Sequence, residues 1–397
     1  MRPLSSKIRD LEESQTLLLT QKARLLQSAG VDVVSLTAGE PDFATPSHIK
    51  EAAIRAIESD FTHYTANQGT ADLIEAVIDK FASDNDLHFS PSRILVSTGA
   101  KQSLFNALAA ILNPGDEVLI PAPYWVSYPA IVRLADGVPV IVSFPGESAF
   151  RPDLRLLRRA IGPKTRALIL NTPCNPTGVV FTRSEVEEIA ELASEANLTV
   201  ISDEIYEKMV FDGMKHFSIG AVDAIREQVV TVNGVSKSYA MTGWRIGYMG
   251  GPEEIIRAAG KVQGQVTNNA NSIAQKATVA ALRGPQGPID AMRGEFQRRR
   301  DYLALRLRAY GGGTLRIPEG AMFYFLGVEH WFGKGAHDRV IRDAADLAAH
   351  LLEHHHVAVV PGDAFGAPGY IRLSFAASMA ELEKGMDRLL RGLQELQ

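Results

Sequence analysis

Short runs of apolar residues, each followed by polar or glycine-containing turns, recur in the first two thirds of the chain. Five of them have the length of buried strands: residues 94–97, 117–120, 166–171, 198–202 and 229–232. Short apolar runs without strict alternation are typical of strands buried on both faces of a sheet. The pattern therefore predicts a sheet whose strands run mostly parallel.

Helical patterns separate these predicted strands. Residues 102–112 follow the run 94–97, and residues 183–197 lie between two other runs. Alternation of strands and helices over about residues 46–282 predicts an α/β fold with a mostly parallel central sheet and helices on both faces.

A run rich in proline and glycine at residues 284–288 interrupts the alternation, and an amphipathic helical pattern follows at 290–310. We expect this helix to lead into a smaller α/β domain. The predicted organisation is an N-terminal arm at 1–15, the first part of the small domain at 16–45, a large domain at 46–285 and the small C-terminal domain at 286–397.

The segment 234–248, GVSKSYAMTGWRIGY, carries the strongest chemical signal. Lys237 lies in a loop after the run 229–232, where exclusion of water lowers the pKa of an amine and makes it nucleophilic toward carbonyl groups. Arg245 is a permanent cation suited to a phosphate. An amine for the aldehyde and a cation for the phosphate are what pyridoxal 5'-phosphate (PLP) requires. A lone Lys237 would be interpreted as a solvated loop lysine, so this reading depends on the rest of the site.

Polar side chains after other strands supply that rest. Asp203 follows the run 198–202, at the carboxyl end where ligands bind in open α/β sheets, and its carboxylate would keep a pyridine nitrogen protonated. Tyr206 and Asn175 are candidates to bind the phenolic oxygen of the ring, and Trp125 to stack on it. The alternatives are a helix N-cap for Asp203, a turn residue for Asn175 and core packing for Trp125.

A phosphate site is predicted where the run 94–97 meets the helix at 102–112. Gly99, Ala100 and Lys101 form the connecting turn. Backbone N–H groups at a helix N-terminus have no partner within the helix, so they are available to an anion.

With these motifs in place, the chain resembles the fold-type-I PLP-dependent aminotransferases of the aspartate aminotransferase family, in particular the prokaryotic-type aspartate/prephenate subgroup. The resemblance covers residues 14–378 and rests on LTAGEPDF (36–43), HYTANQGTADL (63–73), STGAKQSLFNAL (97–108), PYWVSYP (123–129), NTPCNPTG (171–178), SDEIYE (202–207), the lysine segment and YIRLSFAAS (370–378). It implies the PLP-dependent transferase fold of type I, with a smaller α/β domain beside the central sheet.

The resemblance also implies roles for individual residues. Lys237 would hold the cofactor covalently and move the proton, Asp203 would pair with the ring nitrogen, and Trp125 would stack on the ring. Asn175 and Tyr206 would bind the ring oxygen. The phosphate would be bound by Gly99, Ala100, Lys101, Arg245 and, from the neighbouring subunit of a homodimer, Tyr64.

Substrate contacts are implied in the same way. Arg372 and Gly39 would bind the α-carboxylate, and Lys101 the distal carboxylate of a dicarboxylic substrate. Thr16 matches a threonine position linked with prephenate use, and Trp125 and Asn175 would also face the substrate. Lys101 has an alternative reading as a helix-start lysine that faces water. One departure is visible: many relatives have a hydroxyl residue where this chain has Gly234, and Ser236 is a candidate substitute.

The implied reaction is ping-pong transfer of an amino group between L-aspartate or L-glutamate and 2-oxoglutarate, oxaloacetate or prephenate. The alternative is an aromatic or broad-specificity aminotransferase, or a PLP-dependent lyase on the same fold. A nucleotide-dependent dehydrogenase would need G-x-G-x-x-G after its first strand, which the chain lacks. A PLP-binding regulator would carry a DNA-binding domain, whereas about forty residues precede the predicted large domain.

Composition agrees with this reading. The chain has 397 residues, 46% hydrophobic and 22% charged, enough for two domains with large cores. A net charge of −5 gives no reason to bind nucleic acid or an anionic membrane. The single cysteine, Cys174, fits a reducing compartment. With no secretory signal and no transmembrane run, we expect a cytoplasmic protein.

Two charged or polar runs are interpreted as structural. His354, His355 and His356 point in different directions on a helix, and no carboxylate or cysteine spacing supports a metal site there. We predict a polar helix end and no metal site. The basic run 298–300 is expected to be a solvated helix face.

Overall fold

The computed structural model describes residues 5–9, 11, 13–310, 314–336 and 339–396, so part of the predicted N-terminal arm lies outside the described residues. Within these ranges, no helix is both long enough and apolar enough to span a bilayer.

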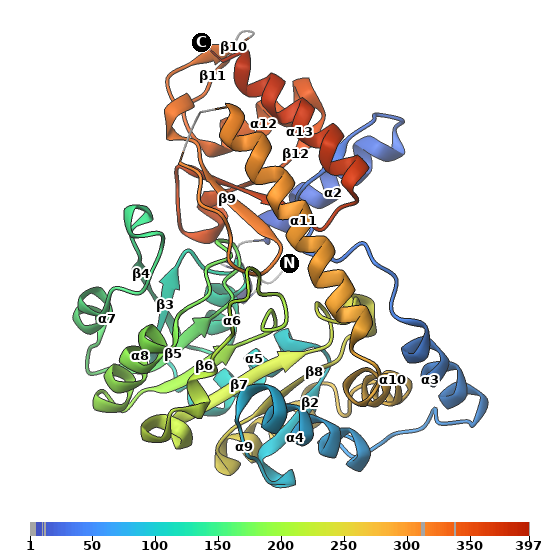
Figure 1. The fold of residues 1–397 in the computed structure, drawn as a ribbon. Helices are drawn as coiled ribbons and strands as arrows, with labels where there is room; N and C mark the ends of the chain where they lie inside the picture. The colour runs from blue at the N-terminus through green and yellow to red at the C-terminus, as the bar shows by residue number, and fades with distance from the viewer. Residues whose placement is uncertain (1–4, 10, 12, 311–313, 337–338, 397) are drawn as a thin grey trace.

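Seven strands form the central sheet, in the order β2-β8-β7-β6-β5-β3-β4 (Figure 1). Their bounds are Ile94–Ser97 (β2), Glu117–Ala122 (β3), Val138–Ser143 (β4), Thr165–Asn171 (β5), Thr199–Asp203 (β6), Val229–Gly234 (β7) and Gly247–Gly250 (β8). Only β8 pairs antiparallel with its neighbours in this sheet. The predicted mostly parallel sheet is therefore confirmed, and β4 and β8 are added to the five strands expected.

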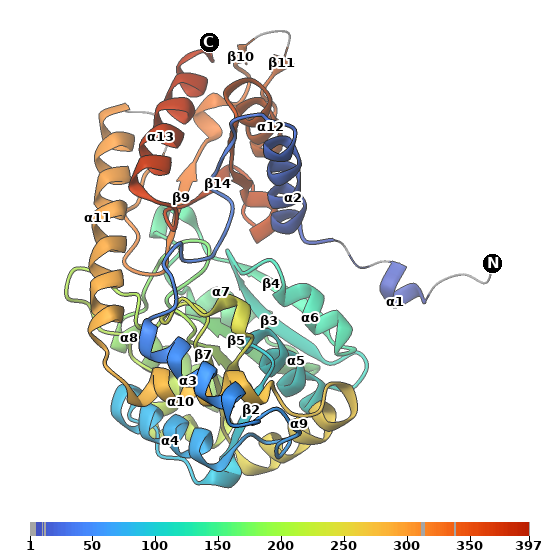
Figure 2. The same ribbon diagram turned by 90° about the vertical axis from the view of Figure 1, so that its right-hand side faces the viewer.

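Helices cover both faces of this sheet (Figure 2). One face packs on α5 (Ala100–Ile111), α6 (Tyr128–Leu134) and α9 (Glu253–Val266). The other face packs on α3 (Ser47–Glu58), α4 (Ala71–Asn85) and α10 (Ser272–Arg283) near β2, and on α7 (Leu154–Ala160) and α8 (Arg183–Glu195) near β5. Ile169 joins the core on the α5 side while Leu168 and Leu170 join the core on the α8 side, because successive strand residues point to opposite faces.

A local signal sets where α8 begins. The Thr182 hydroxyl accepts from the backbone N–H of Glu185, and the Glu185 carboxylate accepts from the backbone N–H of Thr182 at 2.7 Å. This capping box satisfies two backbone donors that have no partner inside the helix.

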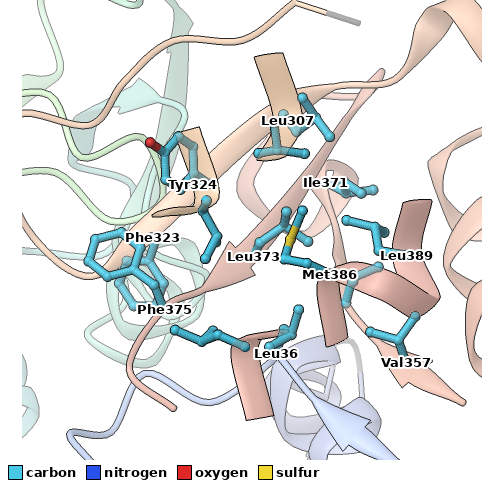
Figure 3. Packing of buried hydrophobic residues seen from close by; sticks show 14 of the residues in the cluster. Leu36, Leu307, Phe323, Tyr324, Val357, Ile371, Leu373, Phe375, Met386 and Leu389 are labelled. Carbon is cyan, nitrogen blue, oxygen red and sulfur yellow. The ribbon is translucent and has the colours of Figure 1, made fainter. Parts of the chain in front are cut away.

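A second hydrophobic core is built from both ends of the chain. Its elements are α2 (Gln15–Ser28), β1 (Val34–Ser35), β9 (Phe323–Gly327), α12 (Ala344–His355), β12 (Val357–Ala358), β13 (Val360–Pro361), β14 (Tyr370–Ser374) and α13 (Met379–Gln394). The parallel pair β1–β12 ties residues 34–35 to the C-terminal part, and β13, β14 and β9 form an antiparallel sheet. Figure 3 shows Leu36 packed among Leu373, Phe375 and Met386.

Helix α11 (Gly287–Tyr310) runs from the hydrophobic core around the central sheet, the first core, to the second core (Figure 1). Ile289 belongs to the core beside α10, whereas Phe296 and Leu307 belong to the second core. We propose that the two cores are the two domains predicted from the sequence, with the limits given there.

The expectation that residues 298–300 form a solvated face was wrong for two of the three arginines. Arg299 and Arg300 are buried, and only Arg298 is exposed. Arg299 pairs with Asp42 at 2.7 Å, and Arg300 pairs with Asp212 at 2.6 Å. Because α11 packs against segments of both cores, Arg299 and Arg300 lie on its buried side, where they reach acidic partners far away in the sequence.

Candidate active site

A cavity of about 370 Å³ opens where β5, β6 and β7 end and the second core begins. Twelve of the fourteen residues proposed from the sequence line it: Thr16, Gly39, Ala100, Lys101, Trp125, Asn175, Asp203, Tyr206, Ser236, Lys237, Arg245 and Arg372. The carboxyl ends of parallel strands share one edge of the sheet, which explains why segments so far apart in sequence converge here.

Lys237 lies just beyond β7, and its Nζ donates to the carbonyl oxygen of Gly39 at 2.6 Å. Burial lowers the pKa of Lys237 to about 8, with Glu40 acting in the opposite direction and Arg245 and Arg372 adding to the decrease. A solvated loop lysine would have none of these influences. The amine is therefore substantially neutral near pH 8, as a nucleophile or general base must be.

Asp203 ends β6 and is buried. Its Oδ2 accepts from the Tyr128 hydroxyl at 2.8 Å, and its Oδ1 accepts from the backbone N–H of Ile205 at 3.2 Å. Burial raises the pKa of Asp203 to about 6, although these two hydrogen bonds oppose the increase. The helix N-cap alternative was wrong, because a turn and no helix follows Asp203. The carboxylate binds an N–H group of that turn and lines the cavity.

Sequence reasoning missed two polar residues at this position. Tyr128, the first residue of α6, supplies the hydrogen bond to Asp203. Asn171 lies beside Asp203 in the β5–β6 register, and its Nδ2 donates to the Asp203 carbonyl oxygen at 2.9 Å. The strand-end position of Asn171 was a usable signal; the side-chain contact of Tyr128, 75 positions away from Asp203, was not. The cavity is completed by Leu17, Leu104, Ile205 and Thr242.

The turn before α5 has the geometry of an anion cradle. Gly99 has φ +85°, and a Cβ there would collide with the Arg245 guanidinium. A Cβ at Gly247 would collide with the backbone of Gly99 and Ala100. The missing side chains thus let Arg245 and the start of α5 lie against each other, so a cation and free helix N–H groups face the same space.

The glycine at position 234 has a structural cause. A Cβ there would lie 2.9 Å from the carbonyl oxygen of Ile246 and 3.1 Å from Cα of Gly247. The close approach of β7 and β8 therefore leaves no room for a hydroxyl-bearing side chain at this position. Ser236 is buried and lines the cavity.

Arg372, on β14, is a buried cation between two aromatic rings. Its guanidinium lies 4.2 Å from the ring centre of Phe323 and 4.8 Å from that of Phe365. It donates to Asn175 Oδ1 at 2.9 Å and to the Thr37 carbonyl oxygen at 2.6 Å, and Nε has no partner among the described residues. Burial lowers the pKa of Arg372 to about 10, so it stays charged at neutral pH. None of the described carboxylates forms an ion pair with it, which leaves the group available to an anionic ligand.

Lys101 is exposed as a residue, but its ammonium lies 4.8 Å from the Trp125 ring centre. Burial and the cation of Arg245 lower its pKa. The side chain therefore lines the cavity. The alternative, a helix-start lysine that faces water, required the side chain to extend into solvent. Thr16 reaches the same cavity from α2, and its hydroxyl has no hydrogen-bond partner within the described ranges.

Comparison with known proteins identifies this arrangement. The family model described as "Aminotransferase class I and II" matches residues 31–389. The chain belongs to this family. An aspartate/prephenate aminotransferase of Nitrosomonas europaea is 44% identical over 97% of this chain and 98% of its own length.

Solved structures agree. The aspartate aminotransferase of Rhizobium meliloti superposes with a TM-score of 0.97 at 42% identity over all of both chains. That of Thermus thermophilus, solved with maleate, gives a TM-score of 0.93 at 43% identity over 99% of this chain and 100% of its own. The fold class and the aminotransferase activity predicted from the sequence are thereby confirmed.

Two predicted site residues of this aminotransferase do not line the cavity. Gly99 lies next to it, against Arg245. Tyr64 is 87% exposed and is away from the cavity within this chain. The contact between Tyr64 and the phosphate site of a neighbouring subunit stays a prediction.

The histidine run lies where it was expected, but one reason given for it was wrong. His354 and His355 end α12, and His356 is its left-handed cap. The fold brings Glu395 to 3.1 Å from His355 Nε2, although the sequence spacing showed no carboxylate. His350 lies in the same group, with ligand atoms within 4.8 Å. We interpret the contact as a polar contact that joins the end of α12 to the residue after α13.

We expect Lys237 of the cofactor-free aminotransferase to react with trinitrobenzenesulfonate with an apparent pKa of about 8, because burial disfavours its charged form. Peptide mass spectrometry across roughly pH 6 to 11 measures the labelled fraction, with exposed Lys261 as internal reference. Arg245→Met should raise the apparent pKa of Lys237, since a neighbouring cation is removed. An apparent pKa near 10 in the unmodified chain would contradict the assignment.

Proposed function

We propose that this aminotransferase uses PLP and moves an amino group between L-aspartate or L-glutamate and a 2-oxo acid: 2-oxoglutarate, oxaloacetate or prephenate. The observation that carries the proposal is that Lys237, whose pKa is lowered, and the buried Asp203 share one cavity in which the other charged residues are cations. Such a cavity suits an aldehyde cofactor with a phosphate and substrates with carboxylates.

The residues present fit PLP on structural grounds. The cradle of Gly99, Ala100 and Arg245 suits the phosphate, because a side chain at Gly99 would fill that space. Ser236 supports it as a substitute for the hydroxyl excluded at Gly234. Asp203 is proposed to pair with the ring nitrogen, Asn175 and Tyr206 to bind the ring oxygen, and Trp125 to stack on the ring.

When bound, PLP supplies an aldehyde that captures the amino group and a ring that withdraws electrons from the α-carbon. Lys237 is proposed to carry a proton from the substrate α-carbon to the carbon of the cofactor's aldehyde group, a 1,3-shift by one base, in the first half of a ping-pong reaction. In the second half it would carry the proton in the opposite direction. Its lowered pKa suits this use, since a general base must be neutral before it can accept a proton. Asp203 is proposed to hold a proton on the ring nitrogen, which its burial next to Tyr128 supports.

The substrate class rests on two cations. Arg372 and the backbone of Gly39 are proposed to bind the α-carboxylate, because a guanidinium matches a carboxylate with two parallel hydrogen bonds. Lys101 is proposed to bind the distal carboxylate, with Thr16 beside the same space. A dicarboxylic substrate is supported by the structure of the Thermus thermophilus relative with maleate, itself a dicarboxylate. The Nitrosomonas europaea relative, an aspartate/prephenate aminotransferase, supports the same substrate class.

A half-reaction tests the function. Purified enzyme loaded with PLP should change absorbance when aspartate or glutamate is added and should recover when 2-oxoglutarate follows. Lys237→Ala should lose turnover by several orders of magnitude, because it removes both the covalent partner and the base. Lys261→Ala, an exposed lysine on α9, is the matched control and should keep normal turnover. Near-normal turnover of Lys237→Ala would refute the assignment.

We expect Lys101→Ala to lower kcat/KM for aspartate, glutamate and prephenate by at least about tenfold, or roughly 1.4 kcal/mol, and to leave alanine and phenylalanine nearly unchanged. The reason is that the distal carboxylate alone loses its partner. Arg372→Ala should instead harm every substrate. Steady-state assays over this panel decide the matter. Equal losses for aspartate and phenylalanine would favour a broad or aromatic aminotransferase.

We also propose that the enzyme works as a homodimer in which Tyr64 reaches the phosphate site of the partner subunit. Its 87% exposure supports this, as do the exposed Ile54 and Ile57 on α3. Mixing inactive Lys237→Ala with an inactive Tyr64 variant, after dissociation and reassociation, should restore roughly a quarter of normal activity, since half the dimers then hold one complete site. A fully active monomer in sedimentation would exclude this arrangement.

The cytoplasm is the compartment we propose. The single buried cysteine supports it, because nothing in this chain requires an oxidising environment. Fractionation of the native host cells with an antibody to the protein tests this location.

A further inference from the structure

The five-residue segment Asp203–Glu207 has two faces. Asp203, Ile205 and Tyr206 line the cavity, whereas Glu204 and Glu207 do not. Both glutamates are nevertheless buried, and Glu204 is completely so. Two carboxylates are thus enclosed directly behind two residues proposed to bind the cofactor ring.

Glu204 is held by four donors. The hydroxyls of Ser202 and Ser218 donate to Oε1 at 2.8 and 2.7 Å. His216 Nε2 lies 2.9 Å from Oε2, and Asn85 Nδ2 donates to the same oxygen at 3.0 Å. A carboxylate with this many donors is fixed in position, because no rotation of its side chain would satisfy all of them.

Glu207 is held from α4. Asn85 Nδ2 donates to Glu207 Oε2 at 2.7 Å, and the Lys80 ammonium pairs with Oε1 of the same carboxylate. Lys80 also donates to Asn85 Oδ1 at 2.5 Å. The amide of Asn85 therefore connects both glutamates and the lysine, so Lys80, Asn85, Glu204, Glu207 and His216 form one unit, the back-face network.

This network is closed by protein groups. Glu204, Glu207 and His216 have ligand atoms close enough for a metal ion. The Lys80 ammonium and the Asn85 amide already satisfy the glutamates, however, and a cation among them would repel a metal. Burial alone would raise the pKa of Glu204, but attraction to His216 and hydrogen bonds from His216 and the two serines hold it below its ordinary value. Burial alone would lower the pKa of His216, and Glu204 outweighs that effect and raises it.

Apolar side chains of similar size would fill such a space without the cost of removing charges from water. What they would not supply is direction: a hydrogen-bonded carboxylate fixes both the place and the rotation of its backbone. Glu204 directly follows Asp203 in the chain, and Glu207 directly follows Tyr206. Glu204 N–H donates to the Val232 carbonyl at 2.9 Å, and Glu207 N–H donates to the Glu204 carbonyl at 3.0 Å. Any shift of the glutamates therefore moves Asp203 and Tyr206.

We propose that the back-face network holds Asp203 and Tyr206 in position for the cofactor ring. It acts from the side of the segment Asp203–Glu207 that faces away from the cavity. The inference rests on the proposed use of PLP. It assigns Glu204, Glu207, His216, Lys80 and Asn85 as positioning residues, since none of them lines the cavity.

Charge-neutral variants test the proposal at low temperature, after circular dichroism has checked that each variant is folded. Glu204→Gln and His216→Gln should each weaken the binding of PLP to cofactor-free enzyme by about tenfold, because each leaves a buried charge without its partner. The double variant should recover to within about threefold of the original affinity, since both charges are then gone. Fluorescence titration with PLP measures affinity, and amide hydrogen exchange over residues 203–209 should rise in the single variants and fall again in the double one.

A matched control separates position from stability. Tyr324→Phe removes a buried hydrogen bond to the Arg300 carbonyl, in the second core, and should lower the melting temperature while leaving PLP affinity unchanged. If Glu204→Gln does not fold, Ser218→Ala removes one donor to Glu204 and should weaken PLP binding by about twofold to threefold.

The outcomes are distinct. PLP affinity equal to that of the original enzyme in both single variants would overturn the positioning role, whatever their melting temperatures. Weakened affinity without recovery in the double variant would show that the side chains matter for packing and not as a charge pair, which also overturns it. If the unmodified chain fails to bind PLP, the proposed function itself fails.

Discussion

Burial of charge at the carboxyl edge of the seven-stranded sheet is the constraint on which the site depends. The parallel register sets Asn171 beside Asp203 and Asp203 beside Val232, so the ends of β5, β6 and β7 converge. Charged groups without water are costly, and Asp203, Lys237 and Arg372 are each held by hydrogen bonds. The same burial moves the pKa of Lys237 down to about 8 and that of Asp203 up to about 6, which brings both close to neutral pH.

Positively charged side chains outnumber negatively charged ones among the residues that line the cavity. Lys101, Lys237, Arg245 and Arg372 are cationic, and Asp203 is the one carboxylate among the residues that line it. Arg372 is the clearest case, because it is buried between aromatic rings with no described carboxylate in contact. Anionic ligands would neutralise the excess positive charge of this cavity. A phosphate and two carboxylates would balance it, which agrees with the proposed cofactor and dicarboxylic substrates.

Much of this could be predicted from the sequence, for reasons that can be stated. The five predicted strands were found because buried parallel strands appear as short apolar runs. The positions of Asp203 and Lys237 at the cavity could be predicted because ligands bind beyond the carboxyl ends of such strands. What could not be predicted depends on side chains that meet across long distances in sequence. Tyr128 reaches Asp203 from the start of α6, and local patterns contain no information on that contact.

The buried arginines of α11 are a second example of contacts that local sequence patterns do not predict. A run of three arginines indicates a solvated face when the helix is considered alone, yet Arg299 and Arg300 have partners at Asp42 and Asp212. Asp42 follows shortly after Gly39, which accepts a hydrogen bond from Lys237. The cavity is shared by two cores, so Arg372 on one and Lys237 on the other are kept in register only if the cores hold a fixed relation. A helix that packs into both cores, and whose Arg299 pairs with Asp42 close to Gly39 in the sequence, supplies that relation. Its charged face is therefore part of the site's architecture.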